Sequence, residues 1–206
     1  MTNWLNGQLL TPPSCRLQKT PSMTAPKIIA NIPVLGIAAF SGTGKTTLIE
    51  KLLPLLGSKG LRTGMVKASH HTIEPDPPGK DSYRLRHAGA SQLVLSMPGR
   101  SICYTEYPDG YEKQLQEQLQ LLNQNQLDLI MVEGFREAPI PKIELHRSDY
   151  EKPFLFTDDP HIIAIAWDGN PGINLPDHLA ELDINRPEHI AGFIENFCHR
   201  YERGQA

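Results

Sequence analysis

The chain has 206 residues, of which 39% are apolar and 21% are charged, an ordinary composition for one globular domain with an ample core. Its formal net charge of −3 gives no electrostatic reason to expect binding to nucleic acid or to an anionic membrane. It has no window of roughly 18 consecutive apolar residues that could form a membrane helix, and residues 1–10 do not resemble a secretory signal. Its 3 cysteines are far apart and predict neither a redox pair nor a thiolate metal site, so we expect a cytoplasmic location.

Residues 1–30 contain several prolines among polar side chains and show no sustained hydrophobic period, which predicts a flexible N-terminal arm. The domain itself is expected to span residues 31–206, where strand-like and helix-like stretches alternate. This alternation indicates an α/β fold with a mostly parallel central sheet flanked by helices.

The apolar stretch 33–39 predicts the first buried strand, and leucines at core-facing spacing predict a helix over residues 44–56. Pro54 is expected to kink or shorten this helix near its last turn. Further strands are expected at 62–67, 92–96, 101–105, 127–132 and 162–166, and further helices at 83–88, 111–123 and after Pro187.

The segment that joins the first strand to the first helix reads Ala-Phe-Ser-Gly-Thr-Gly-Lys-Thr and ends at Thr46. A strand, a glycine-bearing turn and a helix in this order are typical of a P-loop, in which backbone N–H groups and a helix N-terminus bind nucleotide phosphates. The segment departs from the usual pattern only at Ala39, where the pattern has glycine; the alternative is a chance turn. Lys45 is expected at the β- and γ-phosphates and the Thr46 hydroxyl in the Mg²⁺ shell. The predicted nucleotide-binding residues are Ser41, Gly42, Thr43, Gly44, Lys45, Thr46 and Thr47.

Charged residues follow two other predicted strands. Glu133 ends the apolar run 129–132, and in P-loop proteins an acidic residue at this point helps to hold Mg²⁺. Lys67 ends the second strand, and because ligands of open α/β sheets bind at the carboxyl ends of strands, we expect both residues on the same rim as Lys45. The alternative for Glu133 is a solvated carboxylate at a strand end.

His70 and His71 follow Lys67 on the same predicted rim. Three interpretations are open: a transition-metal site, contacts to phosphate or to a phosphorylated ligand of a partner, and exposed loop histidines. Adjacent residues point in different directions on an extended chain and no third ligand is evident nearby, which disfavours the metal site.

Two aspartates also have two interpretations each. The run from Gly79 through Lys80 and Asp81 either caps a helix or brings the Asp81 carboxylate near Mg²⁺ or the attacking water. Asp168, after the strand at 162–166, either recognises a guanine base through its N–H donors or forms an Asp-Gly turn.

Together these segments resemble the MobB family, the adapter proteins of molybdopterin-guanine dinucleotide biosynthesis. The resemblance runs from about Pro33 to the C-terminus, and residues 1–30 have no counterpart in it. Residue 68, where the family often has His, is Ala here, so no direct role is expected of it. The segments that carry the resemblance are 38–47, 67–71, 79–82, 88–90, 128–135 and 180–185.

The resemblance implies a P-loop GTP-binding domain, usually a homodimer, with weak GTP hydrolysis and Mg²⁺ as its cation. It also implies cooperation with the guanylyltransferase that joins GMP to molybdopterin, by positioning GTP or by handling molybdopterin or its guanine dinucleotide. On this basis Thr46 and Glu133 serve Mg²⁺, Asp81 and Glu133 are the catalytic candidates, and His70, His71 and Lys80 face the partner or the pterin.

Two other functions compete with the adapter. A P-loop kinase acting on a small metabolite would need an arginine-rich lid that closes over the γ-phosphate. Arg136 and Arg147 are far apart in the sequence and do not form a clustered lid, but Arg84 and Arg86 could take its place. A GTPase metallochaperone would use His70 and His71 but lacks a His-rich tract. No residue is clearly suited to position the attacking water, so we expect at most a slow GTPase.

Overall fold

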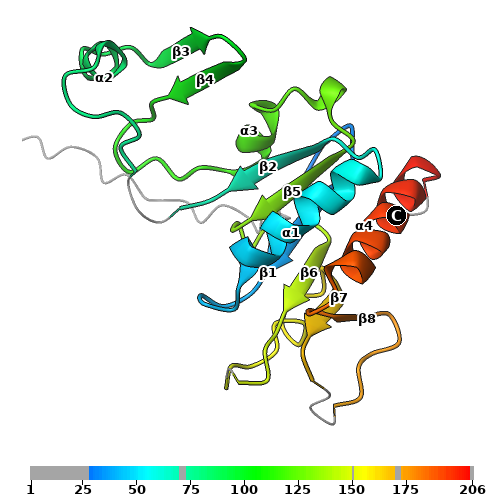
Figure 1. Ribbon diagram of the computed structural model, residues 1–206. Coiled ribbons are helices and arrows are strands. Elements are labelled where there is room, and N and C mark those ends of the chain that lie inside the picture. Colours follow the sequence, from blue (N-terminus) through cyan, green and yellow to red (C-terminus); the bar gives the residue numbers. More distant parts are fainter. Residues whose placement is uncertain (1–27, 70–72, 150, 170–172, 205–206) are drawn as a thin grey trace, which may run out of the picture.

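The computed structural model describes residues 28–69, 73–149, 151–169 and 173–204 (Figure 1). Its centre is a six-stranded sheet with the order β2-β5-β1-β6-β7-β8, in which every pairing is parallel. The predicted α/β fold with a mostly parallel central sheet is confirmed. The strands are β1 (Val34–Ala38), β2 (Thr63–Lys67), β5 (Leu129–Glu133), β6 (Lys142–Leu145), β7 (Ile162–Trp167) and β8 (Ala180–Asp183).

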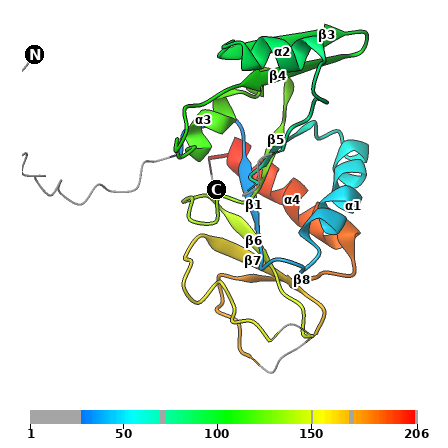
Figure 2. The same ribbon diagram turned by 90° about the vertical axis from the view of Figure 1, so that its left-hand side faces the viewer.

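Helices cover both faces of this sheet, as a parallel sheet with buried strands requires. α1 (Lys45–Ser58) and α4 (Pro187–Glu202) pack side by side on one face, and α3 (Leu115–Gln120) lies on the other (Figure 2). Because successive strand residues point to opposite faces, Leu35 of β1 joins the core beneath α1 and α4, whereas Val34 packs with Leu115 of α3. A short 3₁₀ helix, η1 (Gln124–Gln126), leads from α3 towards β5.

The first described residues are attached to α3. The side chain of Gln116 accepts a hydrogen bond from Ile29 N (2.7 Å) and donates one to Ile29 O (2.8 Å). Ile28 and Ile32 pack against the apolar cluster around α3. Most of the predicted N-terminal arm, residues 1–27, lies outside the described residues.

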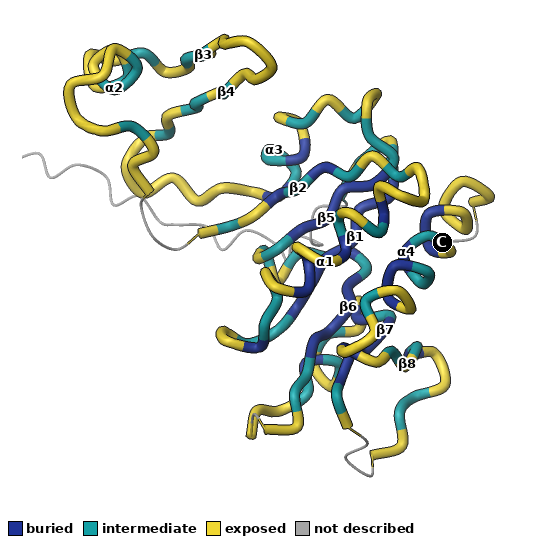
Figure 3. Tube along the Cα trace, viewed as in Figure 1, coloured by how far each residue is buried: buried dark blue, intermediate teal, exposed yellow. Residues whose placement is uncertain are grey.

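A second part of the molecule stands off beyond the β2 edge of the sheet (Figures 1 and 2). It consists of α2 (Asp81–His87) and an antiparallel hairpin of β3 (Gln92–Met97) and β4 (Arg100–Thr105). We call residues 73–106 the hairpin lobe. No residue of this lobe is buried, whereas the sheet strands are mostly buried (Figure 3).

Several sequence expectations need correction. The strands expected at 92–96 and 101–105 exist, and they pair with each other in this separate hairpin. Pro54 does not shorten α1, which continues to Ser58, and the helix expected over 111–123 is only α3. α2 begins at Asp81 with Lys80 as its N-cap, so Asp81 is the first helical residue and not a cap. β6 and β8 were not predicted.

The described helices include none with the length and apolar character needed to cross a membrane.

Candidate functional site

The turn between β1 and α1 has the backbone geometry of a phosphate-binding loop. Gly42 (φ 84°) and Gly44 (φ 95°) both adopt the left-handed conformation, which glycine reaches without steric cost. Gly44 is the N-cap of α1 and has no side chain that could cap the first N–H groups of the helix. These N–H groups and the helix dipole favour an anion at this position.

Lys45 folds back over its own loop. Its Nζ donates hydrogen bonds to the carbonyl oxygens of Ala39 (3.1 Å) and Phe40 (3.0 Å), and the buried Thr43 hydroxyl donates to Phe40 O (2.9 Å). Partial burial lowers the pKa of Lys45; nearby Glu133 opposes this and Lys67 adds to it. The loop is thus closed by its own lysine and threonine.

Thr46, Lys67 and Glu133 meet at the carboxyl ends of β2 and β5. The parallel pairing of these strands places Lys67 directly opposite Glu133. Lys67 Nζ lies 2.9 Å from Glu133 Oε2 and 3.2 Å from Thr46 Oγ1, and Thr46 Oγ1 lies 3.5 Å from Glu133 Oε1. The structure therefore brings Lys67 and Glu133 to one rim, as expected, and places the Thr46 hydroxyl beside them.

This group fits a hard cation. Thr46 and Glu133 present oxygen atoms, the ligands that Mg²⁺ prefers, and a positively charged ammonium group already lies between them. Across the described residues, no cluster of three or more His, Cys, Asp or Glu side chains is arranged to hold a metal. A Mg²⁺ ion here would therefore depend on a few protein oxygens together with phosphate and water.

A tight backbone turn follows Glu133. Gly134 adopts φ 94°, and a Cβ added there would lie 2.6 Å from the Cβ of Ala68. Ala68 N donates to Glu133 O (2.8 Å), which holds the two segments together. The close approach of Ala68, together with the left-handed backbone, explains why glycine stands at position 134. Phe135 is also left-handed (φ 48°), a strained conformation for this side chain.

Two arginines that lie far apart in the sequence both reach the P-loop. The Arg136 guanidinium lies 5.2 Å from the centre of the Phe40 ring, and Arg147 Nε donates to Thr43 O (3.3 Å). Each follows the carboxyl end of a strand that neighbours β1. The signal that could have identified them was this position after a strand, but for Arg147 the strand itself, β6, was not predicted.

Asp168, after β7, is connected to the P-loop through Arg147. Its Oδ2 accepts a hydrogen bond from Arg147 Nη1 (2.9 Å) and its Oδ1 accepts one from Ser148 N (2.8 Å). Burial alone would raise its pKa, but the hydrogen bonds from Ser148 and Arg147 outweigh it, so the pKa of Asp168 lies below its usual value. The structure thus places Asp168 beside the site with a defined orientation.

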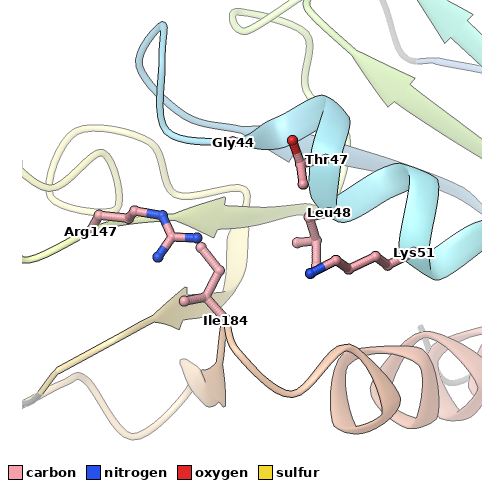
Figure 4. Close-up of a pocket in the computed structure, with 6 residues that line it drawn as sticks. All are labelled: Gly44, Thr47, Leu48, Lys51, Arg147 and Ile184. Atoms are coloured by element: carbon pink, nitrogen blue, oxygen red, sulfur yellow. The ribbon is translucent and has the colours of Figure 1, made fainter.

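A small pocket of about 30 Å³ lies between the P-loop and Arg147 (Figure 4). Thr47 lines it, and Ser41 is exposed in the loop itself. The residues around the pocket are Gly44, Thr47, Leu48, Lys51, Arg147 and Ile184.

The remaining predicted residues are not part of this group. Lys80 and Asp81 belong to the hairpin lobe, and Figures 1 and 2 show α2 well separated from the turn between β1 and α1. The Asp81 carboxylate is largely exposed and lies 3.6 Å from Arg84 on its own helix. His70 and His71 lie outside the described residues.

The family model described as "Molybdopterin guanine dinucleotide synthesis protein B", MobB, matches residues 34–168. The chain belongs to the MobB family. This match covers the P-loop, the rim formed by Thr46, Lys67 and Glu133, and Asp168.

Relatives and solved structures agree with this family. The chain is 44% identical over 170 residues to the molybdopterin-guanine dinucleotide biosynthesis adapter protein of Escherichia coli (strain K12), covering 82% of this chain and 95% of that protein. The adapter protein of Haemophilus influenzae is 42% identical over 170 residues, covering 82% of this chain and 92% of its own length. A crystal structure of molybdopterin-guanine biosynthesis protein B has a TM-score of 0.62 at 25% identity, covering 81% of this chain and 99% of that chain.

Proposed function

We propose that the chain is a GTP-binding adapter in molybdopterin-guanine dinucleotide biosynthesis that assists the guanylyltransferase attaching GMP to molybdopterin. Two MobB relatives with more than 40% identity carry the name of adapter proteins of this biosynthesis. The observation that carries the proposal is the P-loop of this chain, with Thr46, Lys67 and Glu133 gathered beside it. This arrangement supports the binding of a nucleoside triphosphate.

In the proposed complex, α1 and the loop before it bind the phosphates. Lys45 would leave the carbonyl groups of Ala39 and Phe40 and extend to the phosphate oxygens, since both are acceptors for its ammonium group. Thr46 and Glu133 would hold Mg²⁺, which when bound supplies positive charge to the phosphates. Asp168 and Arg147 would lie on the side of the base.

Slow hydrolysis fits the surroundings of the loop. Both arginines near it are already engaged, Arg136 over Phe40 and Arg147 with Thr43 and Asp168. Asp81, the second catalytic candidate, lies in the hairpin lobe away from the loop (Figure 1). Glu133 lies 3.5 Å from the Thr46 hydroxyl but is already paired with Lys67 at 2.9 Å.

The hairpin lobe supports the proposal of a homodimer. It exposes apolar side chains, among them Leu85 (54% exposed), Val94 (63%) and Met97 (37%). A hairpin of only two strands is marginally stable without further packing. A second copy of the chain would cover these side chains, so removing them should shift the molecule towards a monomer in analytical ultracentrifugation.

The structure does not favour the kinase. Arg86, one of the two substitutes for a lid arginine, is only 7% exposed and pairs with Glu74 and Glu106. A side chain held in this way is not free to close over a γ-phosphate. Arg84 is exposed, but it lies on the same remote helix.

The test is calorimetric titration with GTP and with ATP in the presence of Mg²⁺, with phosphate release followed in the same samples. GTP should bind in preference to ATP, with slow release of phosphate. Lys45→Ala should weaken GTP binding by about 1.5–3 kcal/mol, roughly 10- to 150-fold.

Lys59→Ala is the matched control, because Lys59 pairs with Glu195 at 2.7 Å and is no part of the P-loop. An affinity for GTP that Lys45→Ala leaves unchanged would remove the P-loop assignment. Turnover of GTP at about tens per second by the isolated protein would contradict the adapter role.

A further inference from the structure

The ammonium group of Lys67 occupies the point at which the oxygen atoms of Thr46 and Glu133 converge. It lies 2.9 Å from Glu133 Oε2 and 3.2 Å from Thr46 Oγ1, within hydrogen-bond distance of both. Glu133 and Thr46 are the same two residues whose oxygens suit a divalent cation. One positive charge thus already neutralises the carboxylate.

We propose that Lys67 is the resident counter-cation of this site, which exchanges with the Mg²⁺ of an incoming nucleotide. The inference rests on the proposed GTP binding and adds the identity of the residue that competes for the cation position. While the ammonium group occupies this point between the oxygens, a metal ion cannot occupy it.

The mobility of the three side chains decides which of them moves. The Glu133 side chain is only 12% exposed and lies at the end of a central strand, and Thr46 is part of α1. The Lys67 side chain is 53% exposed and lies at the end of β2, which has a neighbour on one side only. A lysine is a compact charge on a flexible stem, so Lys67 can leave the site with its backbone in place.

The exchange has a consequence for a nucleotide without metal. As long as Lys67 remains, Glu133 is neutralised and the phosphates meet a positive site even when Mg²⁺ is absent. Without Lys67, Glu133 would repel the phosphates unless Mg²⁺ is present. Lys67 should therefore reduce the dependence of GTP binding on Mg²⁺.

The experiment measures the ratio of two dissociation constants for GTP, one in EDTA and one with saturating Mg²⁺. Lys67→Met should raise this ratio by about tenfold compared with the unmodified protein, mainly by weakening binding in EDTA. Lys67→Arg keeps the positive charge, so its ratio should lie close to that of the unmodified protein. Lys59→Met removes a lysine that is paired with Glu195 and should leave the ratio unchanged.

If the role of Lys67 were purely structural, Lys67→Met would raise both dissociation constants by the same factor and leave their ratio unchanged. That result in Lys67→Met would overturn the exchange.

A second measurement separates this inference from the proposed function. The thermal unfolding midpoint of the nucleotide-free protein is followed as MgCl₂ is added. Because Lys67→Met leaves Glu133 without a counter-cation, Mg²⁺ alone should raise the midpoint of this variant more than that of the unmodified protein. If this difference appears while GTP does not bind either protein, GTP binding is wrong and the cation exchange stands. Equal midpoint shifts in both proteins contradict the exchange even where GTP binds.

Discussion

The sheet domain and the hairpin lobe are stabilised in opposite ways. In the sheet domain, Leu52 of α1 and Ile190 of α4 are fully buried against the sheet. In the hairpin lobe no residue is buried as a whole, and the charged side chain of Arg86 is only 7% exposed. The sheet domain is stabilised by its own buried apolar core. The hairpin lobe has no such core, so its stability depends more on polar interactions and on neighbouring molecules.

The interactions of Arg86 hold the lobe together. It donates to Glu106 (2.9 Å) and to Glu74, and its guanidinium lies 4.6 Å from the centre of the Tyr104 ring. The hydrogen bond to Glu106 is the strongest of the influences that raise the pKa of Arg86, so Arg86 remains charged at any practical pH. Asp76 lies 3.6 Å from the same guanidinium. One cation thus joins a loop, a helix and a strand end that share no apolar core.

The largest difference between the two regions should appear when a leucine is shortened in each. Leu52→Ala removes a fully buried side chain and leaves a cavity, which should lower the free energy of unfolding by about 2–5 kcal/mol. Leu85→Ala, in the lobe, removes a side chain that is 54% exposed in the single chain, so it should change the free energy of unfolding of the monomer by less than about 0.5 kcal/mol. Denaturant unfolding monitored by circular dichroism measures both. Equal losses would show that the lobe has a core of its own.

A glycine in each region makes a second comparison. Gly134 (φ 94°) and Gly99 (φ 73°) both have left-handed backbones, but an added Cβ meets Ala68 at 2.6 Å in the first case and nothing within 4 Å in the second. Gly99→Ala should lower the free energy of unfolding only through backbone strain, by about 1–2 kcal/mol, or by less where the turn relaxes. Gly134→Ala adds the clash and should cost about 1–3 kcal/mol more.

Chemical denaturation of both variants provides the measurement. If Gly99→Ala were the more destabilising of the two, the close approach of Gly134 to residue 68 would not be important for stability.

The sequence predicted the parts of the sheet domain that follow simple rules. β1 and β5 are continuous apolar runs, and the P-loop between β1 and α1 has a strong local pattern. β6 was missed because it contains Lys142 and Glu144, which are nevertheless buried. Lys142 pairs with Asp159 at 2.8 Å, and Glu144 accepts hydrogen bonds from Leu155 N and from the next backbone N–H, partners that no local pattern reveals.

Burial raises the pKa of Glu144, and the two backbone hydrogen bonds partly offset this effect. The same reasoning explains Arg147, which could not be placed at the P-loop before its strand was known. It also explains the hairpin lobe: a helix followed by two strands has the same pattern whether or not the strands join the main sheet. Packing across long sequence separations decided these points, and a single sequence contains no direct signal for it.

The lobe itself should respond to the loss of its cation. Arg86→Met removes the guanidinium and leaves Glu74, Asp76 and Glu106 to repel one another. We expect faster amide hydrogen exchange throughout residues 73–106, with protection of the β1 and β5 amides unchanged. Hydrogen exchange with mass spectrometry resolves the two regions.

Arg62→Met is the matched control, because Arg62 is a charged partner in the sheet domain. It should leave the exchange of residues 73–106 as it was. Uniform loss of protection in Arg86→Met would mean that the lobe and the sheet unfold as one unit.

The smallest effect is expected from a surface ion pair of the sheet domain. Arg62 donates to both carboxylate oxygens of Asp128 (2.8 and 2.9 Å) and thereby lowers the pKa of Asp128 to about 2. A carboxyl group whose pKa is lowered by folding stabilises the protein above its unfolded pKa, and this contribution is lost as the pH falls through the folded pKa. Because both side chains are partly exposed, Asp128→Asn should cost only about 0.5–1 kcal/mol at pH 7.

That cost should diminish as the pH is lowered from about 4 to about 2, measured by urea denaturation of both proteins across this range. A cost independent of pH would mean that Asp128 acts through its neutral hydrogen bonds. A small, pH-dependent cost would show that ion pairs only add to a sheet domain that is already held by its apolar core, in contrast to the lobe, where Arg86 takes the place of such a core.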